Sequence, residues 1–170
     1  MAEPLKQDSP TEKRDVDSHL PAVPSPITKI FATGLFSGYM PVASGTFGAL
    51  VGLLFYLIPS FERPEIILPS SFFVFVVGSL AAGQMEKIYG HDPSIVTIDE
   101  VLGMWVSLLF LPKSFLVIVG AFFLFRAFDI LKPWPARFFD RMHGGWNIML
   151  DDVVAGLYAN LLLQVAIRIL

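Results

Sequence analysis

Two charge-free stretches decide the fold: IFATGLFSGYMPVASGTFGALVGLLFYLIPSF at residues 30–61 and IILPSSFFVFVVGSLAAGQM at residues 66–85. A bilayer crossing needs about 20 apolar residues, with a range of about 17–25, and both stretches are long enough. Three shorter charge-free runs follow, at residues 101–112, 114–125 and 153–167. The pattern predicts an all-α, multi-pass helical membrane protein with about five helices, over residues 31–58, 66–88, 97–111, 114–131 and 151–169.

The composition supports this class and excludes others. Only 16% of the 170 residues are charged and 54% are hydrophobic, whereas an ordinary soluble domain is about 25% charged. A net charge of −3 without a dense basic patch argues against nucleic acid as a partner, and the absence of cysteine excludes thiolate chemistry. A soluble helical bundle with a very apolar core remains the alternative.

The chain divides into a tail and one domain. Residues 1–29 are polar and punctuated by proline, so we expect them to be disordered. Residues 30–170 form the predicted membrane-embedded domain. With five crossings, nine of the twelve basic residues fall on the side of the tail, which the positive-inside bias assigns to the cytoplasm.

Acidic residues lie at the predicted helix ends on this same side: Asp99, Glu100, Asp129, Asp151 and Asp152. Charged groups inside or beside membrane helices are costly and usually face a cavity or a partner. With the basic residues nearby (Arg126, Lys132, Arg137 and Arg141), they predict one polar site at the cytoplasmic face. Carboxylates suit divalent metal ions, and the basic side chains suit an anionic substrate.

Simpler roles stay open for these residues. The acidic pairs at 99–100 and 151–152 would also serve as caps or dipole partners at helix amino ends. Arg126 and Asp129 have the spacing of an ion pair within one helix.

Blocks of sequence in this region resemble a known family. They are GTFG at residues 45–48, DPSIVTIDEVLGMW at 92–105, FRAFDILKPWP at 125–135, and GG at 144–145 followed by DDVVAG at 151–156. In this order they resemble phosphatidylglycerophosphatase A, although Ser44 stands where that family usually carries proline. The resemblance implies a Mg²⁺-dependent enzyme of the bacterial inner membrane that removes the terminal phosphate of the phospholipid phosphatidylglycerophosphate and leaves phosphatidylglycerol.

The chemistry of phosphomonoester cleavage assigns expected roles to the residues. The expected Mg²⁺ ligands are Asp99, Glu100, Asp151 and Asp152. Asp129 is expected to act in catalysis, as a metal ligand, a general base or a nucleophile, and His143 or His91 to protonate the leaving group. The expected phosphate-binding residues are Gly45, Thr46, Arg126, Lys132 and Arg137.

Alternatives remain for the roles and for the function. The glycines at 45 and 48 would also suit close helix packing, and Lys132 and Arg137 would also reach lipid headgroups. A membrane transporter or ion-binding protein would use the same intramembrane carboxylates, and a membrane scaffold is a weaker reading. The spacing does not distinguish phosphatidylglycerophosphate from phosphatidic acid.

Overall fold

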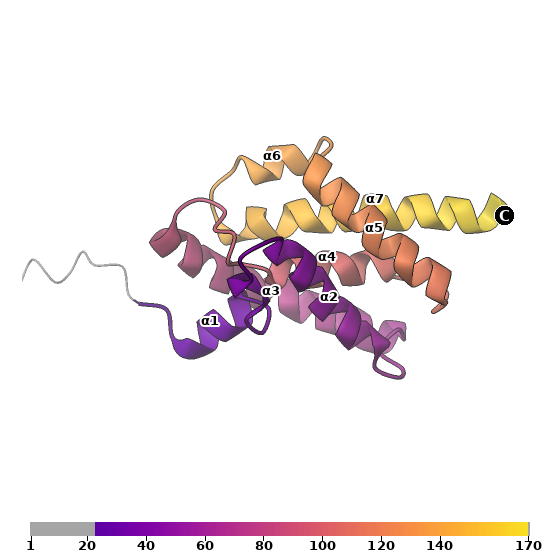
Figure 1. The fold of residues 1–170 in the computed structure, drawn as a ribbon, viewed down its shortest axis with the longest axis horizontal. Helices are drawn as coiled ribbons and strands as arrows, with labels where there is room; N and C mark the ends of the chain where they lie inside the picture. The colour runs from indigo at the N-terminus through magenta and orange to yellow at the C-terminus, as the bar shows by residue number, and fades with distance from the viewer. Residues whose placement is uncertain (1–22, 170) are drawn as a thin grey trace, which may run out of the picture.

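The computed structural model describes residues 23–169, and all the regular secondary structure in this part of the chain is helical. It contains seven α-helices and one 3-10 helix, with no strand among the described residues, instead of the five helices predicted. The elements in chain order are α1 (Pro26–Ala32), η2 (Ser37–Tyr39), α2 (Ser44–Leu57), α3 (Pro64–Tyr89), α4 (Ile98–Leu108), α5 (Phe115–Leu131), α6 (Ala136–Asp140) and α7 (Gly145–Ile169) (Figure 1).

The tail prediction needs a correction where it meets the structure. Residues 1–22 lie outside the described part of the chain. The last residues of the predicted tail, however, belong to α1, whose amino end is capped by Ser25: its Oγ accepts the Thr28 N–H at 3.1 Å. Pro26 at the first helical position favours the same start.

The first predicted helix, over residues 31–58, is three separate elements. The chain leaves α1 through left-handed residues, with φ of +49° at Gly34 and +71° at Phe36, and enters α2 through Ala43 at +54°. Because a left-handed residue cannot continue a right-handed helix, each of these positions breaks the run. The glycines at 38, 45 and 48 and the proline at 41 indicate a loop or broken helix in the opening part of this stretch, and the structure agrees.

The last helix begins six residues earlier than predicted, at Gly145 instead of residue 151. Asp151 and Asp152 therefore lie inside α7, beyond its first turn, and both are buried. Only the first four N–H groups of a helix lack partners within it. The cap interpretation of this acidic pair is therefore wrong.

Helix α4 lies at the centre of the bundle and packs against α2, α3, α5 and α7 (Figure 1). All of its residues from 101 to 108 are buried. Its crossing with α7 is close because both helices carry glycine there. A Cβ on Gly156 would lie 2.5 Å from the Gly103 carbonyl oxygen, and a Cβ on Gly103 would lie 2.9 Å from the carbonyl oxygen of Asp152. The crossing sets the first turn of α4 beside the acidic pair of α7.

The helix ends are sorted between the two ends of the bundle (Figure 1). The turns after α2 and after α4 lie together, because Lys113 Nζ donates to the Ile58 carbonyl at 3.0 Å and contacts Glu62 at 2.8 Å. The carboxyl ends of α3 and α5 and the amino ends of α4 and α7 lie toward the other end. The sequence predicted that the helix ends that carry the acidic residues lie on the same side, and this prediction is confirmed.

By length and composition, α3 and α7 are the helices able to cross a membrane among the described residues, with 26 and 25 residues. Helices α2 and α4, with 14 and 11 residues, are shorter than the expected crossings. Large apolar side chains are nevertheless exposed on the outside of several helices, among them Leu54, Phe72, Leu80, Leu116, Phe123 and Leu161. An apolar outer surface of this kind is typical of contact with lipid or a partner.

Replacing the glycine at the crossing should destabilise the fold. Gly156→Ala places a methyl group against backbone, and overpacking of this kind typically costs about 1–3 kcal/mol. Gly120→Ala is the matched control, because its new methyl would meet only the end of the Leu163 side chain, at 3.2 Å. Thermal unfolding in detergent should show a clear loss for Gly156→Ala and little change for Gly120→Ala. Equal stability of the two variants would contradict the close crossing.

Candidate active site

A polar cavity of about 280 Å³ opens at the end of the bundle where the acidic residues meet. We call it the acidic pocket. Its walls come from the amino end of α2, the loop before α4, the first turn of α4, the last turns of α5, and α7. Its charged lining residues are Asp92, Asp99, Glu100, Asp129, Asp151, Asp152, Arg126 and Lys132. The predicted convergence of the acids is therefore present.

Three carboxylates form the tightest group in this pocket. Glu100, Asp129 and Asp152 each offer one oxygen, and these oxygens lie within 4.8 Å of one another. Arg126 bridges two of them, contacting Glu100 and lying 2.7 Å from Asp129. The i,i+3 ion pair foreseen for Arg126 and Asp129 is thus present, as part of a larger network.

Asp152 is the member of this group that lacks compensation. It is 3% exposed, and its Oδ2 atom is buried without a hydrogen-bond partner in the described part of the chain. A buried carboxylate oxygen without a partner is costly. The lining also contains six acids against two cations. An oxygen-binding divalent cation such as Mg²⁺ fits this donor set and would relieve both costs.

Lys132 organises the other side of the pocket. Its Nζ contacts Asp140, lies 2.7 Å from Asp151 Oδ2 and lies 4.0 Å from Asp92. Burial alone would lower the pKa of Lys132, but the charge of Asp151 and the hydrogen bonds to Asp140 and Asp151 outweigh burial and raise it. The side chain is therefore a fixed positive charge beside the carboxylates.

The four predicted metal ligands divide into two kinds. Glu100 and Asp152 belong to the group of three carboxylates, whereas Asp99 and Asp151 line the pocket outside that group. The Oδ1 atoms of Asp99 and Asp151 each accept the backbone N–H of the following residue, at 3.0 Å in both cases. Asp129 completes the group of three carboxylates instead.

The amino end of α2 faces the acidic pocket, as predicted for the glycine block. Ala43, Ser44 and Gly45 line the pocket, and Thr46 does not. A Cβ on Gly45 would lie 1.9 Å from Glu100 Oε1, so a side chain at this position would displace the Glu100 carboxylate. The first N–H groups of a helix have no partners within it and bind anions. Packing also occurs, because Gly48 lies against Thr97 and Glu100.

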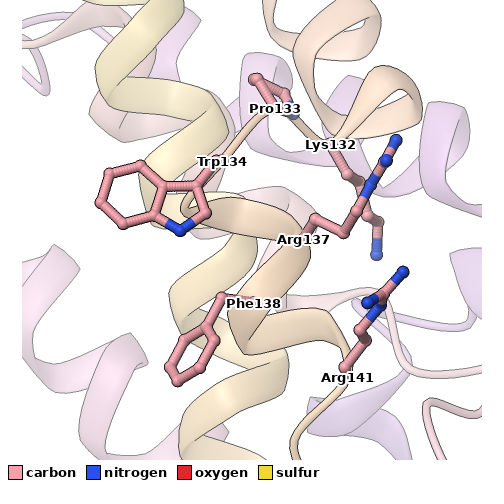
Figure 2. A pocket seen from close by; sticks show the side chains of 6 residues that line it. All are labelled: Lys132, Pro133, Trp134, Arg137, Phe138 and Arg141. Carbon is pink, nitrogen blue, oxygen red and sulfur yellow. The ribbon is translucent and has the colours of Figure 1, made fainter.

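Arg137 lies outside the acidic pocket, in a neighbouring cavity of about 300 Å³ that we call the basic pocket. It is lined by Lys132, Pro133, Trp134, Arg137, Phe138 and Arg141. Figure 2 shows the three cationic side chains on one side and the rings of Trp134 and Phe138 on the other. Lys132 lines both pockets.

His143, predicted to act in catalysis, is not among the residues that line the acidic pocket. It contacts Glu86 together with His91. Conversely, Asp92 and Asp140 belong to the network around Lys132 and were not among the predicted site residues. Asp92 is the first residue of one of the sequence blocks quoted above, so the sequence did contain a signal for it. The contact of Asp140 with Lys132 depends instead on how α6 packs against α7.

The fold and the pocket together define a class: a helical, membrane-associated protein with a carboxylate site beside cations and a helix amino end. Comparison with known proteins identifies the family. The family model "Phosphatidylglycerophosphatase A" matches residues 30–167, and the chain belongs to the phosphatidylglycerophosphatase A family. It is therefore an enzyme, a phosphatase.

Named relatives agree with this family. The chain is 36% identical to "Phosphatidylglycerophosphatase A" of Escherichia coli, over 75% of this chain and 76% of the relative. It is 37% identical to the protein of the same name from Haemophilus influenzae, over 76% and 82%. It is also 38% identical to a Bacteroides thetaiotaomicron protein named "Putative phosphatidylinositol-3-phosphatase", over 84% and 95%. No solved structure matches the chain.

The network around Lys132 should stabilise the fold. Lys132→Met leaves the buried Asp151 carboxylate unpaired, and breaking a buried pair costs about 3 kcal/mol or more. Lys113→Met is the matched control, because Lys113 contacts the more exposed Glu62 at the opposite end. Thermal unfolding should show a much larger loss for Lys132→Met. Equal losses would contradict the structural role of this lysine.

Proposed function

We propose that this protein is a Mg²⁺-dependent lipid phosphatase that hydrolyses phosphatidylglycerophosphate to phosphatidylglycerol and phosphate. The observation that carries the proposal is the group formed by Glu100, Asp129 and Asp152, which lies beside two cations and a helix amino end. The family supports the substrate, because the relatives from Escherichia coli and Haemophilus influenzae are named for that reaction.

Different residues of the pocket would bind the metal ion and the phosphate group. Glu100, Asp129 and Asp152 would hold Mg²⁺, and Arg126 fixes Glu100 and Asp129 in position. Bound Mg²⁺ would supply positive charge against the phosphoryl oxygens and lower the pKa of a bound water. This arrangement favours a ligand role for Asp129 over a nucleophilic one, because its carboxylate is already shared with Arg126.

The phosphate group has two sets of donors in the pocket. Lys132 supplies a positive charge, and the free N–H groups at the amino end of α2, where Ser44 and Gly45 line the cavity, would supply hydrogen-bond donors. Both sets stabilise the charge that develops on the phosphoryl oxygens during cleavage. A phosphomonoester fits this site because its oxygens accept from several donors at once.

Mg²⁺ should stabilise the folded protein through the acidic pocket. At a hundredfold excess over its dissociation constant, a ligand that binds only the folded state adds about 2.7 kcal/mol. The melting temperature of the wild type should therefore rise by several degrees on adding Mg²⁺. Asp152→Asn should abolish most of this rise, whereas Glu62→Gln at the opposite end should keep it. An unchanged rise in Asp152→Asn would contradict the metal assignment.

The basic pocket supplies a reason for substrate choice. Phosphatidylglycerophosphate carries a phosphodiester as well as its terminal phosphomonoester, whereas phosphatidic acid carries only a phosphomonoester. Because Lys132 lines both pockets, a lipid whose monoester occupies the acidic pocket can place its diester against Arg137 and Arg141. Trp134 and Phe138 would face the acyl-chain side, since aromatic rings are enriched at membrane interfaces.

The arginines of the basic pocket should therefore promote binding of phosphatidylglycerophosphate but not of phosphatidic acid. We expect Arg137→Gln and Arg141→Gln each to raise KM for phosphatidylglycerophosphate about tenfold, the equivalent of about 1.4 kcal/mol for a lost charge-assisted contact. Turnover of phosphatidic acid should change little. Arg168→Gln, near the far end of α7, is the control and should match the wild type. Equal losses on both lipids would contradict a diester site.

A second substrate is favoured by the name of the Bacteroides thetaiotaomicron relative, a phosphorylated phosphatidylinositol. Such a lipid also combines a phosphomonoester with a phosphodiester, so it meets the same two pockets. Parallel turnover assays on both lipids and on phosphatidic acid rank the three. The two-pocket arrangement predicts that phosphatidic acid is the poorest substrate.

We further propose that the helices cross the bacterial inner membrane several times, with both pockets at the cytoplasmic face. The apolar side chains exposed on the outer faces of α2, α3, α5 and α7 support embedding. The excess of basic residues at the pocket end supports the orientation.

The absence of cysteine makes this topology directly testable. Ser114→Cys lies at the end opposite the pockets and Met142→Cys lies beside them, and both positions are exposed. A membrane-impermeant thiol reagent should label Ser114→Cys in intact spheroplasts and Met142→Cys only after permeabilisation. The reverse pattern would overturn the orientation, and labelling of both in intact spheroplasts would contradict a spanning protein.

A transporter, the alternative function, would use the same acidic residues to bind ions along a transport path. A transport path needs polar groups through the bundle, whereas the acids of the pocket gather at one end. Ion flux in proteoliposomes without phosphate release would favour the transporter. Phosphate release without flux would favour the phosphatase.

A further inference from the structure

Three side chains outside both pockets form a second polar cluster. Glu86 lies in the last turn of α3, His91 in the loop that follows, and His143 just before α7. The Nδ1 atoms of His91 and His143 lie 3.2 Å and 3.1 Å from the same oxygen, Glu86 Oε1. All the ligand atoms of this group lie within 4.8 Å of one another.

The protonation of His91 is constrained by its other ring nitrogen. His91 Nε2 lies 2.9 Å from the backbone carbonyl of Asp140, and a carbonyl can only accept, so Nε2 carries the hydrogen. In a neutral imidazole, Nδ1 then has a lone pair and no hydrogen. That lone pair faces a carboxylate oxygen, which also only accepts. The contact is favourable only when a positive charge lies between them, either a proton on Nδ1 or a metal ion.

A single metal ion satisfies the contacts of both histidines with Glu86 at once. His143 approaches the same Glu86 oxygen, and the two imidazole rings are only 4.4 Å apart between centroids. Without a metal, a charged His91 and a neutral His143 that donates from Nδ1 would form an ion pair with Glu86, whereas one metal ion would be shared by both ring lone pairs and the carboxylate.

The surroundings already hold these groups in place. The Gly144 N–H donates to Glu86 Oε2 at 2.7 Å, which leaves Oε1 directed at the two rings. The side-chain amide of Asn147 donates to the His143 carbonyl at 2.7 Å. The hydrogen bond from His91 Nε2 to the Asp140 carbonyl is the kind of contact that orients histidine ligands in metal sites. Neighbouring residues therefore hold the three side chains of the cluster in position.

We propose that Glu86, His91 and His143 form a binding site for a divalent transition-metal ion of the zinc class. Two imidazole nitrogens and one carboxylate oxygen form a donor set that zinc takes, at bond lengths of about 2.0–2.2 Å. Tetrahedral geometry at those lengths separates the ligand atoms by about 3.3–3.5 Å, close to the observed 3.1 and 3.2 Å. The His143 side chain is 79% exposed, which leaves the fourth position open to water.

This site is distinct from the acidic pocket in its chemistry and its role. Nitrogen donors suit zinc and oxygen donors suit Mg²⁺, so the two sites select different ions. The ion would tie the end of α3 to the loops before α4 and α7. His91 adjoins Asp92 and holds the Asp140 backbone, and both acids belong to the Lys132 network. The metal would thus position one wall of the acidic pocket.

Direct zinc binding by the full-length protein tests the proposal. The protein is purified in detergent with a tag that contains no histidine, and Zn²⁺ is titrated in the presence of saturating Mg²⁺. We expect one zinc ion per chain, with affinity reduced more than about a hundredfold in the double variant His91→Asn, His143→Asn, since even outer partners of ligands cost about 10–100-fold. The third histidine supplies the control, and His19→Asn should bind zinc as the wild type does.

X-ray absorption of the zinc-loaded wild type keeps the test decisive if the double variant fails to fold. Two imidazole ligands, retained in His19→Asn, would support the site, and a coordination shell of oxygen alone would overturn it. Unchanged zinc affinity in a folded double variant would also overturn it. Absence of saturable zinc binding, with His91 protonated by NMR, would assign the cluster to an ion pair and refute the proposal.

Discussion

The contact between the backbones of α4 and α7 is the constraint on which the rest of the structure depends. Gly103 and Gly156 let the two helices approach so closely that a single methyl group would meet a carbonyl oxygen at either position. This approach places Glu100, in the first turn of α4, within reach of Asp152 on α7. Had the helices been separated by larger side chains, the carboxylates would not share one cavity. The close packing of the two glycines therefore also determines which carboxylates meet in the site.

Electrostatics divides the acidic pocket into two halves with different tasks. On one side Arg126 holds Glu100 and Asp129, and the Oδ2 atom of Asp152 has no partner within the described residues. On the other side Lys132 compensates Asp151 and its neighbours. The first half has one cation, Arg126, for three carboxylates, and one of their oxygens has no partner among the described residues, so this half suits a metal ion. In the second half Lys132 contacts Asp151, Asp140 and Asp92 directly. The basic pocket continues from the second half through Lys132.

The sequence predicted the gathering of the acids because charges within a membrane protein must share a polar site, whatever the details of packing. It did not predict that Glu100, Asp152 and Asp129 form the tight group, because that depends on the rotation of three helices about their axes. The start of α7 was misplaced because the charge-free run begins only after Asp152, while the helix extends back to Gly145. His143 looked catalytic from its position in the chain, but it contacts Glu86 and does not line the acidic pocket.

In the proposed mechanism, the carboxylates at this crossing would hold a metal ion that supplies positive charge for the cleavage of a lipid phosphomonoester. The most direct measurement is phosphate release from phosphatidylglycerophosphate by the purified protein in detergent, first in excess EDTA and then after Mg²⁺ is restored. The account predicts release that stops in EDTA and recovers with Mg²⁺. Full activity in excess EDTA would contradict the metal mechanism, and absence of release with any divalent metal would contradict the substrate.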